Sequence, residues 1–232
     1  MSFPTSVAEP DASRARYCVI PIAGTHGDDG RPTGLWWQSG SPFMRMLARQ
    51  GICHLNEERP FTWSTDLNGH RFWRRWFGRK DSHRDWIAGG YALSYYCWPA
   101  RADTDDYIEL SDRNVIAHSH GGQVVFYACA FAGLRINRLI TVGTPIRADM
   151  KAIIEKARPN IGQWLHVRDE RDATAIWGGI GDGQLRRSTR TGHEDWCDIV
   201  PGIGHSGVLH DESLFFRTWV MRGWVEFLKT GW

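Results

Sequence analysis

Ser119 stands where a short apolar run gives way to a segment that can form a helix. Residues 114–117 are NVIA, which predicts a buried strand, and residues 123–130 are QVVFYACA, which can continue as a helix. Small residues, Ala117 and Gly121, stand two positions before and two positions after the serine. A serine in such a setting is typical of a nucleophile elbow, in which a strained turn lifts the hydroxyl clear of the sheet. The pattern therefore predicts that Ser119 is a nucleophile.

A serine hydroxyl attacks a carbonyl well only when a base accepts its proton, so the chain should also supply a histidine. Four histidines follow Ser119 in the chain: His166, His193, His205 and His210. His205 lies in PGIGHSG, between the last predicted strand and the last predicted helix, from where an imidazole can reach the elbow. We expect His205 to be the base, with His210 as the alternative. His166 lies inside a predicted strand, and His193 lies in a glycine-rich segment.

The base in turn needs a carboxylate that orients it. Sites of parallel α/β proteins lie in loops at the carboxyl ends of strands, so the acid should follow the strand predicted at 164–167. Asp169, Glu170 and Asp172 all meet this condition. We expect Asp172, which stands one loop-length past the strand, with Asp169 as the main alternative. Asp149 is a further alternative because some triads take their acid from the loop after the preceding strand.

Two backbone N–H groups should stabilise the negative oxygen that forms during attack. One is expected from His120, directly after the nucleophile, and the other from Thr25 in the loop after the first predicted strand. This chemistry requires no cofactor and no metal, and no spacing of cysteines and histidines in the chain resembles a zinc site.

The elements that must position these residues alternate along the chain. Strands are predicted at short apolar runs, at 17–22, 52–55, 114–117, 138–142, 164–167 and 198–200. Helices are predicted between them and after them: from Ser41 and Pro42 onward, at 85–97, at 123–130, at 149–158, and at the C-terminus with Leu214, Met221, Val225 and Leu228 on one face. The alternation predicts an α/β fold, with a mostly parallel central sheet and helices on both of its faces.

The chain has 232 residues, a length that suits one domain with a full hydrophobic core. We expect residues 1–15 to be a flexible lead-in and residues 16–232 to form a single domain. Two irregular stretches, near 58–84 and 173–195, are expected to be insertions on that domain.

Charge, hydropathy and cysteine content indicate which binding partners and which cellular compartment to expect. The formal net charge is +2 and is spread along the chain, so no nucleic acid partner is expected. No apolar run is long enough to span a bilayer, and the N-terminal residues contain no apolar signal-peptide core. The five scattered cysteines suit reduced thiols. We therefore expect a cytoplasmic protein.

The chain contains 13 tryptophans, an unusually large number. Five of them fall in predicted loops rather than in regular elements: Trp36, Trp37, Trp63, Trp73 and Trp76. These five side chains either wall an apolar substrate pocket or pack against the core. The sequence alone does not distinguish these two roles.

Four segments resemble the α/β-hydrolase superfamily, on its lipase and esterase side. They are VIPIAGT, VIAHSHGGQVV, LITVGTPIR and GIGHSGVLHD, in that order, within residues 17–211. The resemblance implies a parallel sheet without the antiparallel strands that begin larger members, and it implies Ser119, Asp172 and His205 as the catalytic triad. The chain departs from the family at Ala117, where glycine is usual, and at Ala23, where many lipases carry histidine before the glycine.

A serine hydrolase that cleaves a small-molecule or lipid carboxylic ester is the function expected from these residues. The same fold also hosts thioesterases, peptidases, acyltransferases and dehalogenases, although a dehalogenase would carry an acidic nucleophile at the elbow. The run RFWRRWFGRK at 71–80 raises an alternative. It could dock on anionic lipid, as in a membrane-surface phospholipase or a non-catalytic binding module, or it could be a solvated basic loop.

Overall fold

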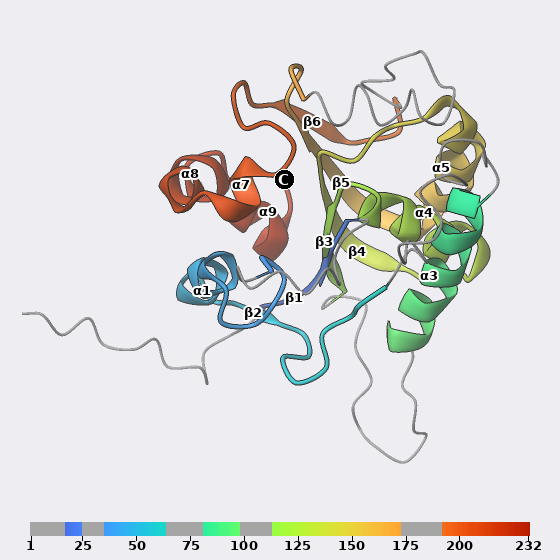
Figure 1. Cartoon of the computed structure of the whole chain (residues 1–232), viewed down its shortest axis with the longest axis horizontal. Coiled ribbons are helices and arrows are strands. Elements are labelled where there is room, and N and C mark those ends of the chain that lie inside the picture. The colour runs from blue at the N-terminus through green and yellow to red at the C-terminus, as the bar shows by residue number, and fades with distance from the viewer. Residues whose placement is uncertain (1–16, 25–34, 64–80, 98–112, 173–191) are drawn as a thin grey trace, which may run out of the picture.

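Six strands form one parallel sheet in the computed structural model, which describes residues 17–24, 35–63, 81–97, 113–172 and 192–232 (Figure 1). The strand order is β2-β1-β3-β4-β5-β6, and every neighbouring pair of strands is parallel. The strands are β1 (Tyr17–Ile22), β2 (Ile52–His54), β3 (Asn114–His118), β4 (Ile136–Val142), β5 (Ile161–Arg168) and β6 (Trp196–Ile199).

Helices cover both faces of the sheet. Figure 1 shows one group on one side, made of α1 (Pro42–Arg49), α7 (Gly207–His210), α8 (Glu212–Phe215) and α9 (Trp224–Thr230). The other side carries α3 (Asp81–Cys97), α4 (Gly121–Phe131) and α5 (Lys151–Ala157). This arrangement confirms the predicted fold class, and it fits the α/β-hydrolase fold that the sequence resembles.

Side chains of each strand alternate between two hydrophobic clusters, one on either face. On β3, Val115 and Ala117 belong to the cluster beneath α3, α4 and α5, whereas Ile116 belongs to the cluster on the opposite face. Strands buried on both faces are apolar throughout, which explains why these runs were recognisable in the sequence.

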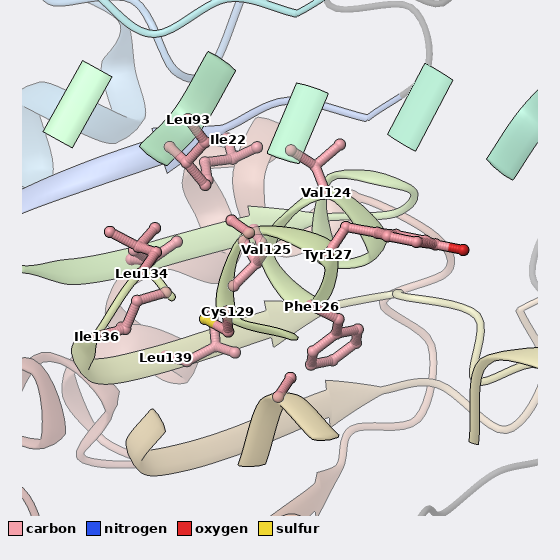
Figure 2. Packing of buried hydrophobic residues seen from close by; sticks show 14 of the residues in the cluster. Ile22, Leu93, Val124, Val125, Phe126, Tyr127, Cys129, Leu134, Ile136 and Leu139 are labelled. Carbon is pink, nitrogen blue, oxygen red and sulfur yellow. The ribbon is translucent and has the colours of Figure 1, made fainter. Parts of the chain in front are cut away.

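Helix α4 is the most enclosed element of the molecule that the structure describes. All of its residues from Gly121 to Ala130 are buried, and Figure 2 shows it surrounded by side chains from α3 and from the strands. A helix of this length would be marginal by itself in water, so tertiary burial holds it in place. Gly90 of α3 allows the close contact, because a Cβ atom there would lie 2.8 Å from the backbone nitrogen of Ala128.

Most predicted elements are present, with shifted ends. Helix α1 begins as expected, since the Ser41 hydroxyl accepts a hydrogen bond from the Met44 N–H at 3.0 Å and Pro42 occupies the first turn. Helix α3 begins at Asp81 rather than at residue 85, and β5 begins at Ile161 rather than at residue 164.

The prediction of one C-terminal helix is wrong. The segment contains α7, α8, a π-helical turn (Phe216–Val220) and α9. Gly223 has a φ angle of +77°, a left-handed conformation that ends one helix before the next begins. As a result, Met221 is 70% exposed, whereas Val225 and Leu228 are buried.

Parts of the expected domain organisation lie outside the described residues. These parts are the lead-in at 1–15, and most of each expected insertion. Over the part of the chain that the structure describes, no helix combines the length and the apolar character needed to cross a bilayer.

The connection between β3 and α4 is a tight turn pressed against β1. Ser119 has a φ angle of +53°, and its backbone N–H donates to the Val142 carbonyl at 2.9 Å. A Cβ atom at Gly121 would lie 2.5 Å from the Ala23 carbonyl oxygen and 2.8 Å from that of Ile22. Any larger residue at position 121 would therefore clash with backbone atoms, which cannot rotate away.

We expect Gly121→Ala to lower the free energy of unfolding by about 1–3 kcal/mol, the usual penalty for an added group in a packed site. Urea unfolding, followed by circular dichroism, measures the loss. Gly207→Ala is the matched control, because a Cβ atom there would meet only Leu214 Cδ1, at 3.5 Å. Equal unfolding midpoints for the two variants would contradict the close approach of β1 and α4.

Candidate active site

Ser119 lies at the tip of the turn, between the ends of β1 and β4. A Cβ atom at Gly24 would lie 2.9 Å from the Ser119 Cβ, so the chain leaving β1 passes directly over the serine. A left-handed conformation in a non-glycine residue is a strained state that the surrounding structure must enforce. Here the hydrogen bond to Val142 and the packing of Gly24 and Gly121 enforce it.

His205 and Asp172 form a short hydrogen bond beneath the surface. The distance from His205 Nδ1 to Asp172 Oδ2 is 2.7 Å, and the side chains are 18% and 3% exposed, respectively. A carboxylate acts only as an acceptor, so the Nδ1–H group donates and Nε2 is left as the basic nitrogen. The structure thus brings together the expected base and the expected acid.

A four-residue turn after β5 positions Asp172. The Asp172 N–H donates to the Asp169 carbonyl at 3.2 Å, and Asp169 Oδ1 accepts from the Arg171 N–H at 2.9 Å. Side-chain acceptors of this kind fix the conformation of short turns. The turn directs the Asp172 carboxylate toward His205, whereas the Asp169 carboxylate faces backbone groups.

The base and the nucleophile approach the same point, the carboxyl end of β4. Gly143 has a φ angle of +57°, and a Cβ atom there would lie 2.6 Å from the His205 carbonyl oxygen and 3.2 Å from His205 Nδ1. Ser119 bonds to Val142, the residue just before Gly143. Within the described residues, no hydrogen bond joins the Ser119 hydroxyl to His205. Such bonds are often long in ligand-free enzymes.

The alternative acids are engaged elsewhere. Asp169 Oδ2 accepts from the Gly204 N–H at 2.9 Å, and Glu170 is 64% exposed. Asp149 accepts two hydrogen bonds from Arg147, at 2.9 and 2.6 Å, and a third from His83 at 2.9 Å. Burial would raise the pKa of Asp149, but these bonds outweigh it and lower the pKa.

The alternative bases have different surroundings from His205. His210 is exposed at the end of α7. His166 is buried within β5, where its Nδ1 lies 2.8 Å from the Thr141 hydroxyl, and burial lowers its pKa to about 4. The backbone carbonyl of His193 accepts from Arg158, which lies just before the amino end of β5.

One of the two expected oxyanion donors is described. His120 directly precedes α4, so its backbone N–H stands at the N-terminal end of that helix, where the helix dipole favours negative charge. Thr25 lies outside the described residues, although its neighbour Gly24 is in contact with Ser119.

Three of the five expected pocket tryptophans are described, and all three are buried in the core. Trp36 and Trp37 are each 4% exposed, and Trp63 is 6% exposed. Trp63 Nε1 donates to the Ala23 carbonyl at 2.8 Å, so this ring also braces the chain beside the elbow. These contacts favour the packing hypothesis for the three residues. Trp73 and Trp76 lie outside the described residues.

A polar network that the sequence did not predict joins His83, Tyr127 and Asp149. His83 lies 2.5 Å from the Tyr127 hydroxyl through Nδ1 and 2.9 Å from Asp149 through Nε2. In Figure 2, the Tyr127 hydroxyl points away from the packed aliphatic side chains. No spacing in the sequence signals this network, because its members come from three separate elements. Across the described ranges, no three metal-ligating side chains gather into a metal site.

Two solved structures are similar to the chain. One is described as a predicted CIB-like hydrolase from Thermoplasma acidophilum, with 15% identity, a TM-score of 0.45, and coverage of 93% of this chain and 87% of that one. The other is the esterase PE8, with 18% identity, a TM-score of 0.38, and coverage of 89% and 94%. No family model and no curated protein matches the chain.

We expect Asp169→Asn to lower stability at neutral pH and to flatten the loss of stability in acid. Burial would raise the pKa of Asp169, but hydrogen bonds from the N–H groups of Arg171, Gly204 and Gly202 outweigh it and lower the pKa. The stabilisation is therefore complete above the unfolded value of about 3.9, and it is lost as the pH falls through the lower folded value.

Urea unfolding midpoints between about pH 7 and pH 2 measure this dependence. Glu170→Gln is the control, because that neighbouring carboxylate is 64% exposed and should leave the acid dependence unchanged. If Asp169→Asn and Glu170→Gln gave the same acid profile, the Asp169 carboxylate would not hold the turn and the Gly204 loop.

Proposed function

We propose that this protein is a serine hydrolase that cleaves a carboxylic ester through an acyl-enzyme intermediate. The observation that carries the proposal is the 2.7 Å hydrogen bond from His205 to the buried Asp172 carboxylate. It occurs where the chain also holds a serine in a strained elbow conformation. An oriented imidazole beside such a serine has the parts that nucleophilic acyl transfer needs.

In the proposed reaction, Ser119 Oγ attacks the ester carbonyl while His205 Nε2 accepts the hydroxyl proton. Asp172 holds the imidazole through Nδ1 and stabilises the imidazolium that forms. The carbonyl oxygen becomes an oxyanion, which the backbone N–H groups of His120 and Thr25 stabilise. His205 then gives its proton to the leaving alcohol, and a water molecule, activated by the same imidazole, releases the acid.

The N-terminus of α4 supports the oxyanion step in particular. A single backbone donor at such a position is typically worth about 10²–10³ in rate. Because α4 is buried along nearly its whole length, its first N–H groups are fixed before substrate arrives. A preorganised donor contributes more than one that must reorient during the reaction.

The proposed substrate is a small-molecule or lipid ester, and of the five loop tryptophans only Trp73 and Trp76, which lie outside the described residues, remain candidate walls of its pocket. The segment at 71–80 lies outside the described residues, so a phospholipase at a membrane surface rests on the sequence alone. A non-catalytic binding module is the other class of function. Loss of ester hydrolysis in variants of the proposed triad separates catalysis from binding.

We expect Ser119→Ala to abolish hydrolysis of p-nitrophenyl acetate and butyrate, because the attacking oxygen is gone. His205→Ala should lose roughly 10³-fold or more in kcat, as removal of a triad member does. His210→Ala is the matched control and should lose far less. Steady-state kinetics measure all three. A wild-type chain that hydrolyses no ester or thioester would favour a binding module, and a larger loss for His210→Ala would move the base.

We expect Asp172→Ala to reduce kcat while leaving more residual activity than His205→Ala, since a misoriented imidazole still works a little. Asp149→Ala is the matched control, because that carboxylate binds Arg147 and His83 rather than His205. The same kinetic assay compares the two variants. Full activity of Asp172→Ala, or a larger loss for Asp149→Ala, would show that Asp172 is not the acid.

A further inference from the structure

The loop that carries His205 packs against the core through Ile203, but it also contains two glycines. Residues 201–206 are PGIGHS, and Gly202 and Gly204 have φ angles of +82° and +59°. A Cβ atom at either glycine would meet no atom within 4 Å, so no close packing restrains the chain on that side of the two glycines. Glycine-rich segments lose more conformational freedom on folding than other segments. A base that must point at a serine to within a fraction of an ångström therefore needs another source of rigidity.

Two hydrogen bonds supply that rigidity, one from the end of β3 and one from the turn after β5. His118, the last residue of β3, places Nε2 at 3.2 Å from the His205 carbonyl oxygen. A carbonyl oxygen can only accept, so His118 donates. Asp169, just after β5, accepts from the Gly204 N–H at 2.9 Å through Oδ2. One bond thus holds the peptide group that directly follows the His205 α-carbon, and the other holds the peptide group between Ile203 and Gly204, just ahead of His205.

The His118 ring also lies against the imidazole of the base. The two ring centroids are 4.8 Å apart, with the planes inclined by 59°. Burial, followed by the proximity of His205, lowers the pKa of His118 to about 3. His118 is therefore neutral at working pH, so it donates its hydrogen bond without placing a positive charge beside the imidazolium that forms on His205.

Asp169 forms hydrogen bonds to both the turn that carries the acid and the loop that carries the base. Its Oδ1 and its carbonyl oxygen accept hydrogen bonds within the turn that ends at Asp172, while its Oδ2 accepts one from the loop that contains His205. One residue, Asp169, therefore helps to position both partners of the 2.7 Å hydrogen bond between His205 and Asp172.

We propose that His118 and Asp169 are positioning residues, which clamp the backbone of the His205 loop so that the imidazole faces Ser119. The inference rests on the proposed function, since it assigns how the base of that reaction is held. The clamp acts through orientation. Its loss should therefore lower kcat and leave substrate binding nearly unchanged.

The test compares variants of the whole chain with p-nitrophenyl acetate. We expect His118→Phe and Asp169→Asn each to lower kcat by roughly 10- to 100-fold, as a misplacement of about 1 Å can, with KM changed less than about twofold. His118→Gln keeps an N–H donor at a similar reach and should recover most of the rate. His54→Phe is the control for loss of a buried histidine elsewhere in the same sheet.

A second readout does not require activity. The Nδ1–H proton of His205 in its bond to Asp172 can be followed by nuclear magnetic resonance, and it should broaden or exchange faster in His118→Phe and Asp169→Asn than in His54→Phe. Wild-type kcat together with an unchanged resonance in both clamp variants would overturn the inference, as would equal losses in His118→Phe and His118→Gln. If the wild type hydrolysed no ester, the proposed function would fail, and the resonance would still decide the clamp.

Discussion

The hydrogen bond between His205 and Asp172 is the interaction on which the site depends. Asp172 is almost wholly buried, and an unpaired carboxylate in such a place would be strongly destabilising. The bond to the imidazole compensates for that burial, and it fixes which ring nitrogen carries the proton. The turn after β5, the approach of Gly143 and the loop at 201–206 all have the geometry needed to make this one bond.

The parallel sheet explains how distant residues reach this point. Ser119 follows β3, Asp172 follows β5, His205 follows β6, and Gly24 follows β1. Because the carboxyl ends of parallel strands lie along one edge, each of these connections opens on the same side of the sheet. Burial of α4, together with the close contact between Gly90 of α3 and the backbone of α4, then fixes the position of the elbow at that edge.

Local sequence patterns were enough to predict the elbow, the first helix and the positions of the strands along the chain. Ser119 with small flanks and Ser41 with Pro42 each act within a few residues, so their patterns are visible without a structure. The break at Gly223 was missed because a single glycine is tolerated in many helices. Asp169 and Asp172 belong to the same turn, so only the tertiary contact with His205 distinguishes them. The contact of His118 likewise joins residues far apart in sequence.

The most direct measurement of the central claim is the site of covalent modification by a fluorophosphonate. Such a reagent reacts with a serine that a neighbouring base activates, and it leaves a stable adduct that intact-protein and peptide mass spectrometry can locate. The account predicts one adduct per chain, on the peptide that contains Ser119, and its absence after His205→Ala. An adduct on another serine, or labelling of Ser119 that persists at the wild-type rate in His205→Ala, would contradict it.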